Sequence, residues 1–196
     1  MVDQPESVLA FWFGAPGSAA EIAGRQSKLW FGKSPANDRA VIERFAATLT
    51  AATAGQLDHW ARTPRGRLAL VIALDQKQAL ALAQRFDPEW GGFGRAPKFP
   101  SPANLFFLLE RAADEEARGM LLHTLDRMAR GGLMDQLAGG FHRYSTDEAW
   151  LVPHFEKMLY DNASLAWLYA EASALAPGAG LDRVARATLD FVLLEM

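Results

Sequence analysis

The sequence contains no cysteine, and this absence excludes several kinds of chemistry at once. Without a thiol there is no disulfide, no cysteine nucleophile and no zinc site built on cysteine ligands. A CxxC motif is also missing, so the chain carries no thioredoxin-type redox pair of its own. Any chemistry must therefore come from carboxylates, imidazoles, cations, hydroxyls and aromatic rings.

An excess of positive charge and long apolar runs are lacking as well. The 196 residues carry a formal net charge of −3, which offers no basic field for nucleic acid. No apolar run approaches the ~20 residues that cross a bilayer. The amino terminus, MVDQPESVLAFWFG, has no basic region before its short apolar run and so does not resemble a secretory signal. We therefore expect a cytoplasmic protein without nucleic-acid or membrane partners.

Helix-forming sequence makes up most of what is present. Half of the residues are apolar, enough for a substantial core. Ser18 and Glu21 have the spacing of a capping box at a helix start, and Gly14 is placed to end a first helix. Short turns separate the predicted helices, which favours an all-α fold of antiparallel helical hairpins. Outside residues 131–163, four helices are expected to open on a first-turn proline: Pro5, Pro35, Pro64 and Pro102.

Polar side chains concentrate between residues 131 and 163, which hold two of the four histidines. Pro153 is well placed to begin a helix that runs to about Ala176, so His154, Lys157 and Asp161 would share one helical stripe. Before it, glycine pairs at 131–132 and 139–140 predict a looped segment with a short extended run at 141–144. His142, from that run, and His154 are then expected to meet in one cleft.

A second irregular stretch, residues 87–100, breaks the helical pattern. Its GGFG is not a phosphate loop, because the GxGxxG spacing and a following GK[ST] are absent. Glycines beside Trp90, Phe93 and Phe99 predict a loop that approaches a ligand, and sugar rings stack well on aromatic faces. The alternative is that these aromatic side chains only seal helix ends, and the sequence leaves both interpretations open.

Three motifs carry a resemblance to a known family: GGFGRAPKFPSPANL (91–105), RGGLMDQLAGGFHRYS (130–145) and WLVPHFEKMLYDNASLA (150–166). Residues 86–196 resemble the YyaL family, also known as the spermatogenesis-associated, thioredoxin-domain-containing proteins. The resemblance implies part of an (α/α)6 barrel of the six-hairpin glycosidase and N-acylglucosamine 2-epimerase type. Ala138 departs from the family pattern, which has glycine there.

The family would also place a thioredoxin-like domain before these motifs and further helical hairpins after LDFVLLEM. We therefore expect residues 77–196 to form a truncated barrel whose exposed edge could support self-association.

The amino-terminal segment resembles a different family. VLAFWFG, KLWFGKSPANDRAVIERFAATLTAATAGQLDHWA and TPRGRLALVIALDQ are similar to the start of domain of unknown function 924, which implies a tetratricopeptide-like helical fold. The similarity covers Val8 to Gln76, where that family continues as DQFPRN and this chain as DQKQALALAQRF. Residues 1–76 and 77–196 are thus predicted to be two segments of different origin joined in one chain, whether by gene fusion or by an artefact.

The resemblance to the YyaL family directs the hypotheses about chemistry. Proton exchange beside a sugar carbonyl needs a base and an acid on opposite faces of the sugar, and His142 and His154 are the candidates. Glu156 or Asp161 would orient an imidazole, and Arg143 or Lys157 would stabilise the oxyanion. The aromatic side chains that would hold the sugar ring are Trp90, Phe93, Tyr144 and Trp150.

Other interpretations compete with epimerisation. Glycoside hydrolysis would use two of Asp147, Glu156 and Asp161, but five positions on one helix separate the last two by about 140°. A metal site lacks a third ligand at motif spacing, so we expect no metal and no cofactor. Because about two barrel hairpins are present, the leading hypothesis is a carbohydrate-related chain without full activity, its motif a buried polar network. A helical interaction module is the remaining alternative.

Overall fold

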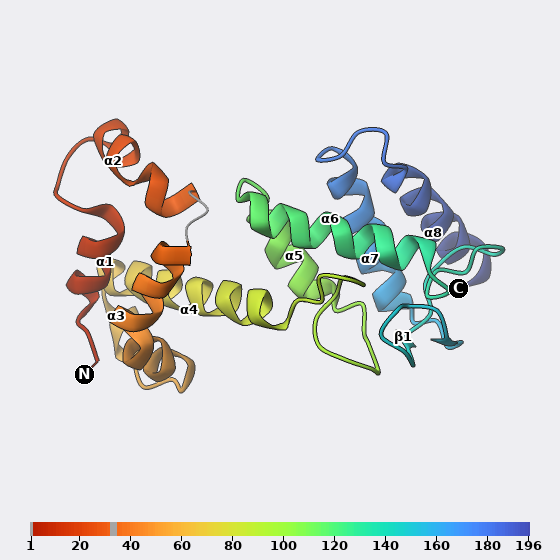
Figure 1. The fold of residues 1–196 in the computed structure, drawn as a ribbon, viewed down its shortest axis with the longest axis horizontal. Helices are drawn as coiled ribbons and strands as arrows, with labels where there is room; N and C mark the ends of the chain where they lie inside the picture. The colour runs from red at the N-terminus through yellow and green to blue at the C-terminus, as the bar shows by residue number, and fades with distance from the viewer. Residues whose placement is uncertain (1, 32–34) are drawn as a thin grey trace. The chain divides into compact units, whose positions relative to one another are not determined.

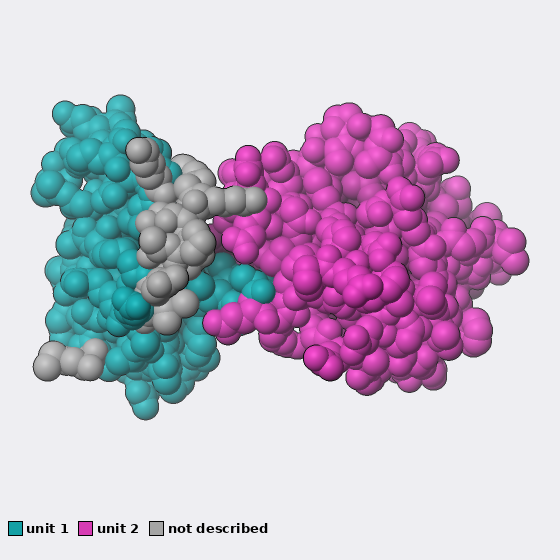
Figure 2. All heavy atoms as spheres, viewed as in Figure 1, with its two compact units in different colours: residues 1–83 teal, residues 84–196 magenta. Residues whose placement is uncertain are grey.

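The computed structural model describes residues 2–31 and 35–196, which form two compact units, residues 1–83 and 84–196 (Figure 2). Almost all regular structure in the described residues is helical, and this confirms the all-α class (Figure 1). The finer assignments, a tetratricopeptide-like segment and a partial barrel, stay predictions. The elements in chain order are α1 (Pro5–Phe13), α2 (Ala19–Phe31), α3 (Pro35–Thr53), η1 (Asp58–Arg62), α4 (Pro64–Arg85), α5 (Pro102–Glu110), α6 (Glu115–Arg130), β1 (Tyr144–Ser145), β2 (Pro153–His154), α7 (Leu159–Ser173) and α8 (Leu181–Glu195).

Local signals fix the helix starts of unit 1 (residues 1–83) as predicted. Helix α1 begins at Pro5 and ends before Gly14. The Ser18 amide donates to the Glu21 carboxylate at 2.8 Å, and the Glu21 amide donates to the Ser18 hydroxyl at 3.4 Å, a reciprocal capping box. Helix α4 begins at Pro64. Ser34, the expected cap of α3, lies outside the described residues.

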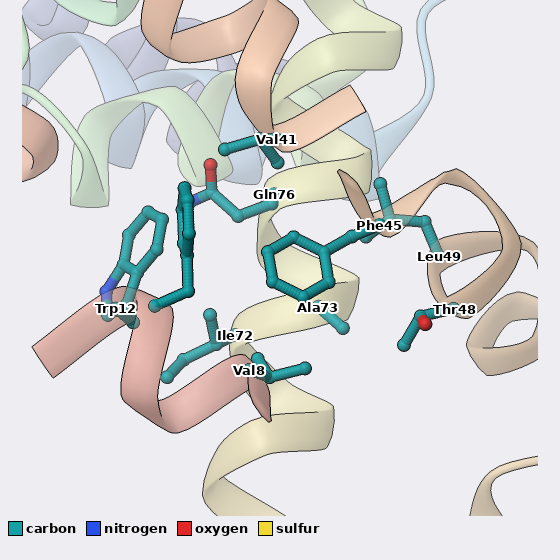
Figure 3. Close-up of a pocket in the computed structure, with 10 residues that line it drawn as sticks. Val8, Trp12, Val41, Phe45, Thr48, Leu49, Ile72, Ala73 and Gln76 are labelled. Carbon is teal, nitrogen blue, oxygen red and sulfur yellow. The ribbon is translucent and has the colours of Figure 1, made fainter. Parts of the chain in front are cut away.

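The core of unit 1 is made by α1, α3 and α4, whose buried side chains include Val8, Phe45 and Ala73. These side chains line a small apolar cavity of ≈20 Å³ (Figure 3). That volume is about one water molecule, so the cavity is a packing defect rather than a ligand site. Gln76, at the predicted join, lines the same cavity from α4.

Helix α4 runs through the predicted join without a break. The boundary between the two compact units falls later, after Ala83. It lies near the end of α4, just before the glycine-rich loop that leads to α5. The prediction that residues 1–76 and 77–196 have different origins rests on the sequence. The division into two compact units does not test it, so it stays a prediction.

Unit 2 (residues 84–196) packs four helices together. Helix α7 lies along α8, and α5 packs against both α6 and α7 (Figure 1). Leu121, Leu125 and Leu165 are fully buried between them. The Tyr169 hydroxyl donates to the Leu125 carbonyl at 2.7 Å, so this buried ring has its polar atom paired.

The expected helix start at Pro153 is wrong. Pro153 and His154 form strand β2, which pairs antiparallel with β1 in the register Tyr144↔His154 and Ser145↔Pro153. Helix α7 begins only at Leu159. The Arg143 amide donates to the Glu156 carbonyl at 2.7 Å, so a distant segment holds this backbone extended. His154, Lys157 and Asp161 therefore do not lie on one helical stripe.

Among the described residues, no helix combines the length and apolar character needed to cross a membrane.

Candidate functional site

Trp150 is the centre of the loops that lie beside the helices of unit 2. Its side chain is 0% exposed, and its indole nitrogen donates to the Trp90 carbonyl at 2.7 Å. A Cβ at Gly92 would lie 2.6 Å from the Trp150 ring, and one at Gly131 would lie 2.5 Å from its carbonyl oxygen. Glycine is required at both positions because any side chain would occupy the space of Trp150. The predicted role of Trp150 in holding a sugar ring does not fit this complete burial.

Lys98 locks the same loops together from inside. Its ammonium group is fully buried and donates to Asp87 Oδ2 at 2.6 Å and to the carbonyls of Gly91 and Glu148 at 2.9 and 2.8 Å. Burial acts to raise the pKa of Asp87, but hydrogen bonds from Lys98 and two backbone amides outweigh it and lower that pKa. With three acceptors, the lysine satisfies all its donors, which is the requirement for a buried charge.

The two predicted aromatic ligands of the glycine-rich loop serve packing. Phe93 is buried and lies 6.1 Å from the Phe86 ring, centroid to centroid. The half-buried Trp90 ring carries the Arg127 guanidinium over its face at 4.2 Å. Phe93 is closed off from solvent and Arg127 covers a face of Trp90, so the interpretation of this loop as a seal over helix ends fits both side chains better.

An exposed stack of three rings lies where this loop meets the hairpin. The Tyr144 and His154 rings are stacked, with centroids 4.8 Å apart and an interplanar angle of 17°. The Phe99 ring lies on Tyr144 at 4.8 Å and 33°. Phe99 is 47% exposed and His154 is also exposed, so the two ends of the stack reach solvent. We call Phe99, Tyr144 and His154 the ring stack.

His142 and His154 lie in different surroundings. It is 7% exposed, its Nδ1 lies 3.2 Å from the Phe155 carbonyl oxygen, and its ring meets the Phe155 ring edge-on. Burial lowers the pKa of His142 and favours the neutral imidazole. Within the described part of the chain, no hydrogen bond or ring contact joins the two histidines. The predicted acid–base pair facing each other across one cleft is therefore not what the structure shows.

Arg143 pairs with one of the predicted carboxylates, Glu156, and acts on a second, Asp161. Its guanidinium pairs with Glu156 Oε2 at 2.8 Å, and the pKa of Arg143 is raised chiefly by Glu156 and slightly by Asp161. Burial raises the pKa of Asp161, with Arg143 acting in the opposite direction. Glu156 precedes α7 rather than lying on it, so the helical separation of about 140° does not apply to this pair. We call Arg143, Glu156 and Asp161 the carboxylate cluster.

Asp147 and Lys157 are committed to holding loops. Both carboxylate oxygens of Asp147 accept backbone amides, from Ala149 and Val152 each at 2.6 Å, and although burial acts to raise its pKa, these bonds lower it. The Lys157 ammonium donates to Asp135 Oδ2 at 2.9 Å and to the Gly139 carbonyl at 2.8 Å. Lys157 therefore fixes the 135–140 loop, and Asp147 is an unsuitable catalytic acid.

Sequence reasoning missed two central residues, Lys98 and Asn162. The Asn162 side chain accepts the Phe141 amide at 2.6 Å and donates to the Phe141 carbonyl at 3.0 Å, which ties the hairpin to α7. A lysine between Pro97 and Phe99, in a loop that also holds the acid Asp87, was the available signal for the first. For Asn162 no local pattern distinguishes it from a solvated helix residue.

Metal ligands do not converge in the part of the chain that the structure describes. No group of three or more histidine, aspartate or glutamate side chains there is arranged to hold a metal ion.

Comparison with known proteins gives separate matches for the two segments. Residues 8–79 match a family model described as a bacterial protein of unknown function, DUF924. Spermatogenesis-associated protein 20 of Homo sapiens is 48% identical over 118 residues, which is 57% of this chain and 15% of the human protein. Both resemblances are thereby confirmed.

Further relatives extend the second match. Spermatogenesis-associated protein 20 of Rattus norvegicus is 45% identical over 118 residues, again 57% of this chain and 15% of the relative. An uncharacterized protein of Caenorhabditis elegans is 48% identical over 93 residues, 44% of this chain and 13% of that protein. The chain thus spans about a seventh of the length of the curated relatives it matches.

Proposed function

We propose that unit 2 binds a small carbohydrate at the β1–β2 hairpin and catalyses no reaction on it. The observation that carries the proposal is the ring stack, whose Phe99 and His154 ends are open to solvent. The C–H faces of a pyranose pack well on aromatic rings, and stacking of this kind needs no buried partner. The expected relation to six-hairpin glycosidases and sugar epimerases supports the same ligand class.

The neighbouring carboxylate cluster would supply hydrogen bonds to sugar hydroxyls. Arg143 and Glu156 pair with each other at 2.8 Å, and both remain partly exposed, so each keeps free donors or acceptors. Turnover by epimerisation is not part of the proposal, because His142 is buried against Phe155 while His154 stacks on Tyr144.

A sugar library screened by thermal shift and by NMR tests the proposal. We expect at least one hexose or hexosamine to stabilise the chain, since a ligand at 100 times its Kd adds roughly 2.7 kcal/mol. Tyr144→Ala should abolish the response, because it removes the middle ring of the stack. The matched control is Trp167→Ala, which removes a 62% exposed aromatic side chain on α7 outside the stack. A library without any binder would favour a helical interaction module instead.

Glycoside hydrolysis is a second candidate, and one observation favours it. Glu156 pairs with Arg143, whose charge also acts on the Asp161 carboxyl, and the raised pKa of that carboxyl suits a general acid. A panel of aryl glycosides tests it: Asp161→Asn and Glu156→Gln should each remove release of the phenol. Asp182→Asn, on α8, is the control. No release by the unaltered chain would remove this candidate and leave binding alone.

A further inference from the structure

A polar cavity of ≈420 Å³ lies in unit 2, apart from the ring stack and the carboxylate cluster. Its size falls in the range of small-molecule sites, roughly 300–1,000 Å³. Residues from the end of α4, the glycine-rich loop and the loop before Trp150 line it: Gln84, Arg85, Phe86, Asp87, Gly94, Arg95 and Glu148. None of these was among the predicted site residues.

Two guanidinium groups at this cavity have no internal partner. Arg85 and Arg95 are exposed, and across the described residues neither side chain makes a hydrogen bond or an ion pair. A Cβ at Gly94 would lie 3.4 Å from Arg85 Nη2, so the Arg85 guanidinium lies over this glycine, at the cavity wall. Both groups offer the forked donors that suit a carboxylate.

The charge balance of the lining favours a ligand with one negative charge. Asp87 is neutralised by Lys98 at 2.6 Å, so its carboxylate does not compete for the two arginines. Among the charged residues that line the cavity, Arg85 and Arg95 are then balanced by Glu148 alone, which leaves one positive charge in excess. A monoanion completes this balance, whereas a dianion would overcompensate it and meet the Glu148 carboxylate.

The rest of the lining matches hydroxyl groups and a ring. Glu148 and Gln84 present a carboxylate and an amide that can accept or donate hydrogen bonds to several hydroxyls. Phe86 lines the cavity with a half-buried aromatic side chain on which a sugar ring can pack.

We propose that this cavity binds a small sugar acid, with its carboxylate on Arg85 and Arg95 and its hydroxyls on Glu148 and Gln84. The site is separate from the ring stack and does not depend on the function proposed above. Its ligand class is a hexuronate, a pyranose that carries one carboxylate.

Isothermal titration calorimetry of the full chain tests the site with D-glucuronate, D-glucose and inorganic phosphate. We expect glucuronate to bind, and glucose, which lacks the carboxylate, to bind at least about tenfold more weakly. Arg85→Ala and Arg95→Ala should each weaken glucuronate binding by about tenfold. Arg186→Ala on α8 removes the same charge outside the cavity and should leave the affinity unchanged. Circular dichroism of each variant shows that the exposed substitution has not unfolded the chain.

Tyr144→Ala removes the ring stack as a second sugar site, so the titrations with glucose and glucuronate are repeated in this variant, which should keep the glucuronate binding of the cavity. Four results would overturn the proposal: no heat with glucuronate at millimolar concentration, equal binding of glucose and glucuronate by Tyr144→Ala, equal weakening by Arg186→Ala, or phosphate binding as tight as glucuronate with the same dependence on Arg85 and Arg95. The last would assign the cavity to anions in general.

Discussion

The His154 ring lies on the Tyr144 ring because strand pairing places the two residues directly opposite each other, with ring centroids 4.8 Å apart. Cross-strand neighbours on one face of an antiparallel pair are the closest side chains in a sheet, and aromatic pairs there add stability. The hairpin therefore holds the exposed His154 ring in a fixed orientation. A helix that began at Pro153 would instead have placed His154 in its first turn.

Removal of the Tyr144 ring should change the NMR signals of His154. In the stack, the imidazole protons lie in the shielding region of the phenol ring, so Tyr144→Ala should move them downfield. The substitution should also lower the free energy of unfolding by about 0.5–1.5 kcal/mol, the usual value of an aromatic pair. Trp167→Ala should leave the His154 signals in place. Unchanged imidazole shifts in Tyr144→Ala would contradict the stack.

Lys98→Met should strongly destabilise unit 2. The substitution leaves the Asp87 carboxylate and the carbonyls of Gly91 and Glu148 without their buried donor. Breaking a buried pair by removing one partner costs about 3–5 kcal/mol, which chemical denaturation can measure. Lys77→Met on α4 is the control. The double variant Lys98→Met with Asp87→Leu should recover part of the loss, since it removes the unpaired charge. No recovery would assign the cost to the unpaired carbonyls and to the two backbone amides that Asp87 accepts.

Gly139→Ala and Gly178→Ala form a matched pair. Both glycines have a positive φ, 78° and 85°, so an alanine at either position costs about 1–2 kcal/mol of backbone strain. A Cβ at Gly139 would also collide with the backbone carbonyl of Ala187 on α8, whereas one at Gly178 meets nothing within 4 Å. We expect Gly139→Ala to cost a further ~1–3 kcal/mol. Equal melting temperatures for the two variants would disprove the close approach.

The stability of the chain should fall in acid partly through Asp135. Backbone amides, first that of Ala138, and the Lys157 ammonium hold the pKa of Asp135 well below its ordinary value. Because the folded pKa is the lower one, this contribution is complete above the unfolded pKa of about 3.9 and is lost as the pH falls toward the folded pKa. Asp135→Asn should cost roughly 1–3 kcal/mol at neutral pH and reduce the slope of stability below pH 4. An unchanged slope would contradict this contribution.

Helix starts were predictable because their signals are local. Pro5, Pro64 and the Ser18–Glu21 pair act within one turn of the backbone they cap, so they work wherever the helix packs. The turn at Ala138 is likewise determined by neighbouring residues. It replaces the glycine of the family pattern, yet its φ is not positive and its amide donates to Asp135 Oδ1 at 3.0 Å, so the turn accepts alanine.

The error at Pro153 has a long-range cause. Proline suits a first helical turn, but Arg143 holds the segment after Pro153 in another conformation. The Arg143 amide donates to the Glu156 carbonyl, and the Arg143 guanidinium pairs with the Glu156 carboxylate. The backbone at 153–156 therefore follows the hairpin. This single change moves Glu156 off the helix, brings it to the arginine that Asp161 also influences, and separates the surroundings of the two histidines.

The sequence alone determined the all-α class, most helix boundaries and the two family resemblances, because capping residues, apolar periodicity and motifs are properties of neighbouring positions. Only the tertiary structure decided that Trp150 and Lys98 are buried, that His142 is shut against Phe155, and that Arg85 and Arg95 face an open cavity. Burial and side-chain pairing depend on segments tens of residues apart, and their energies exceed the local preferences of about 1 kcal/mol that a sequence displays.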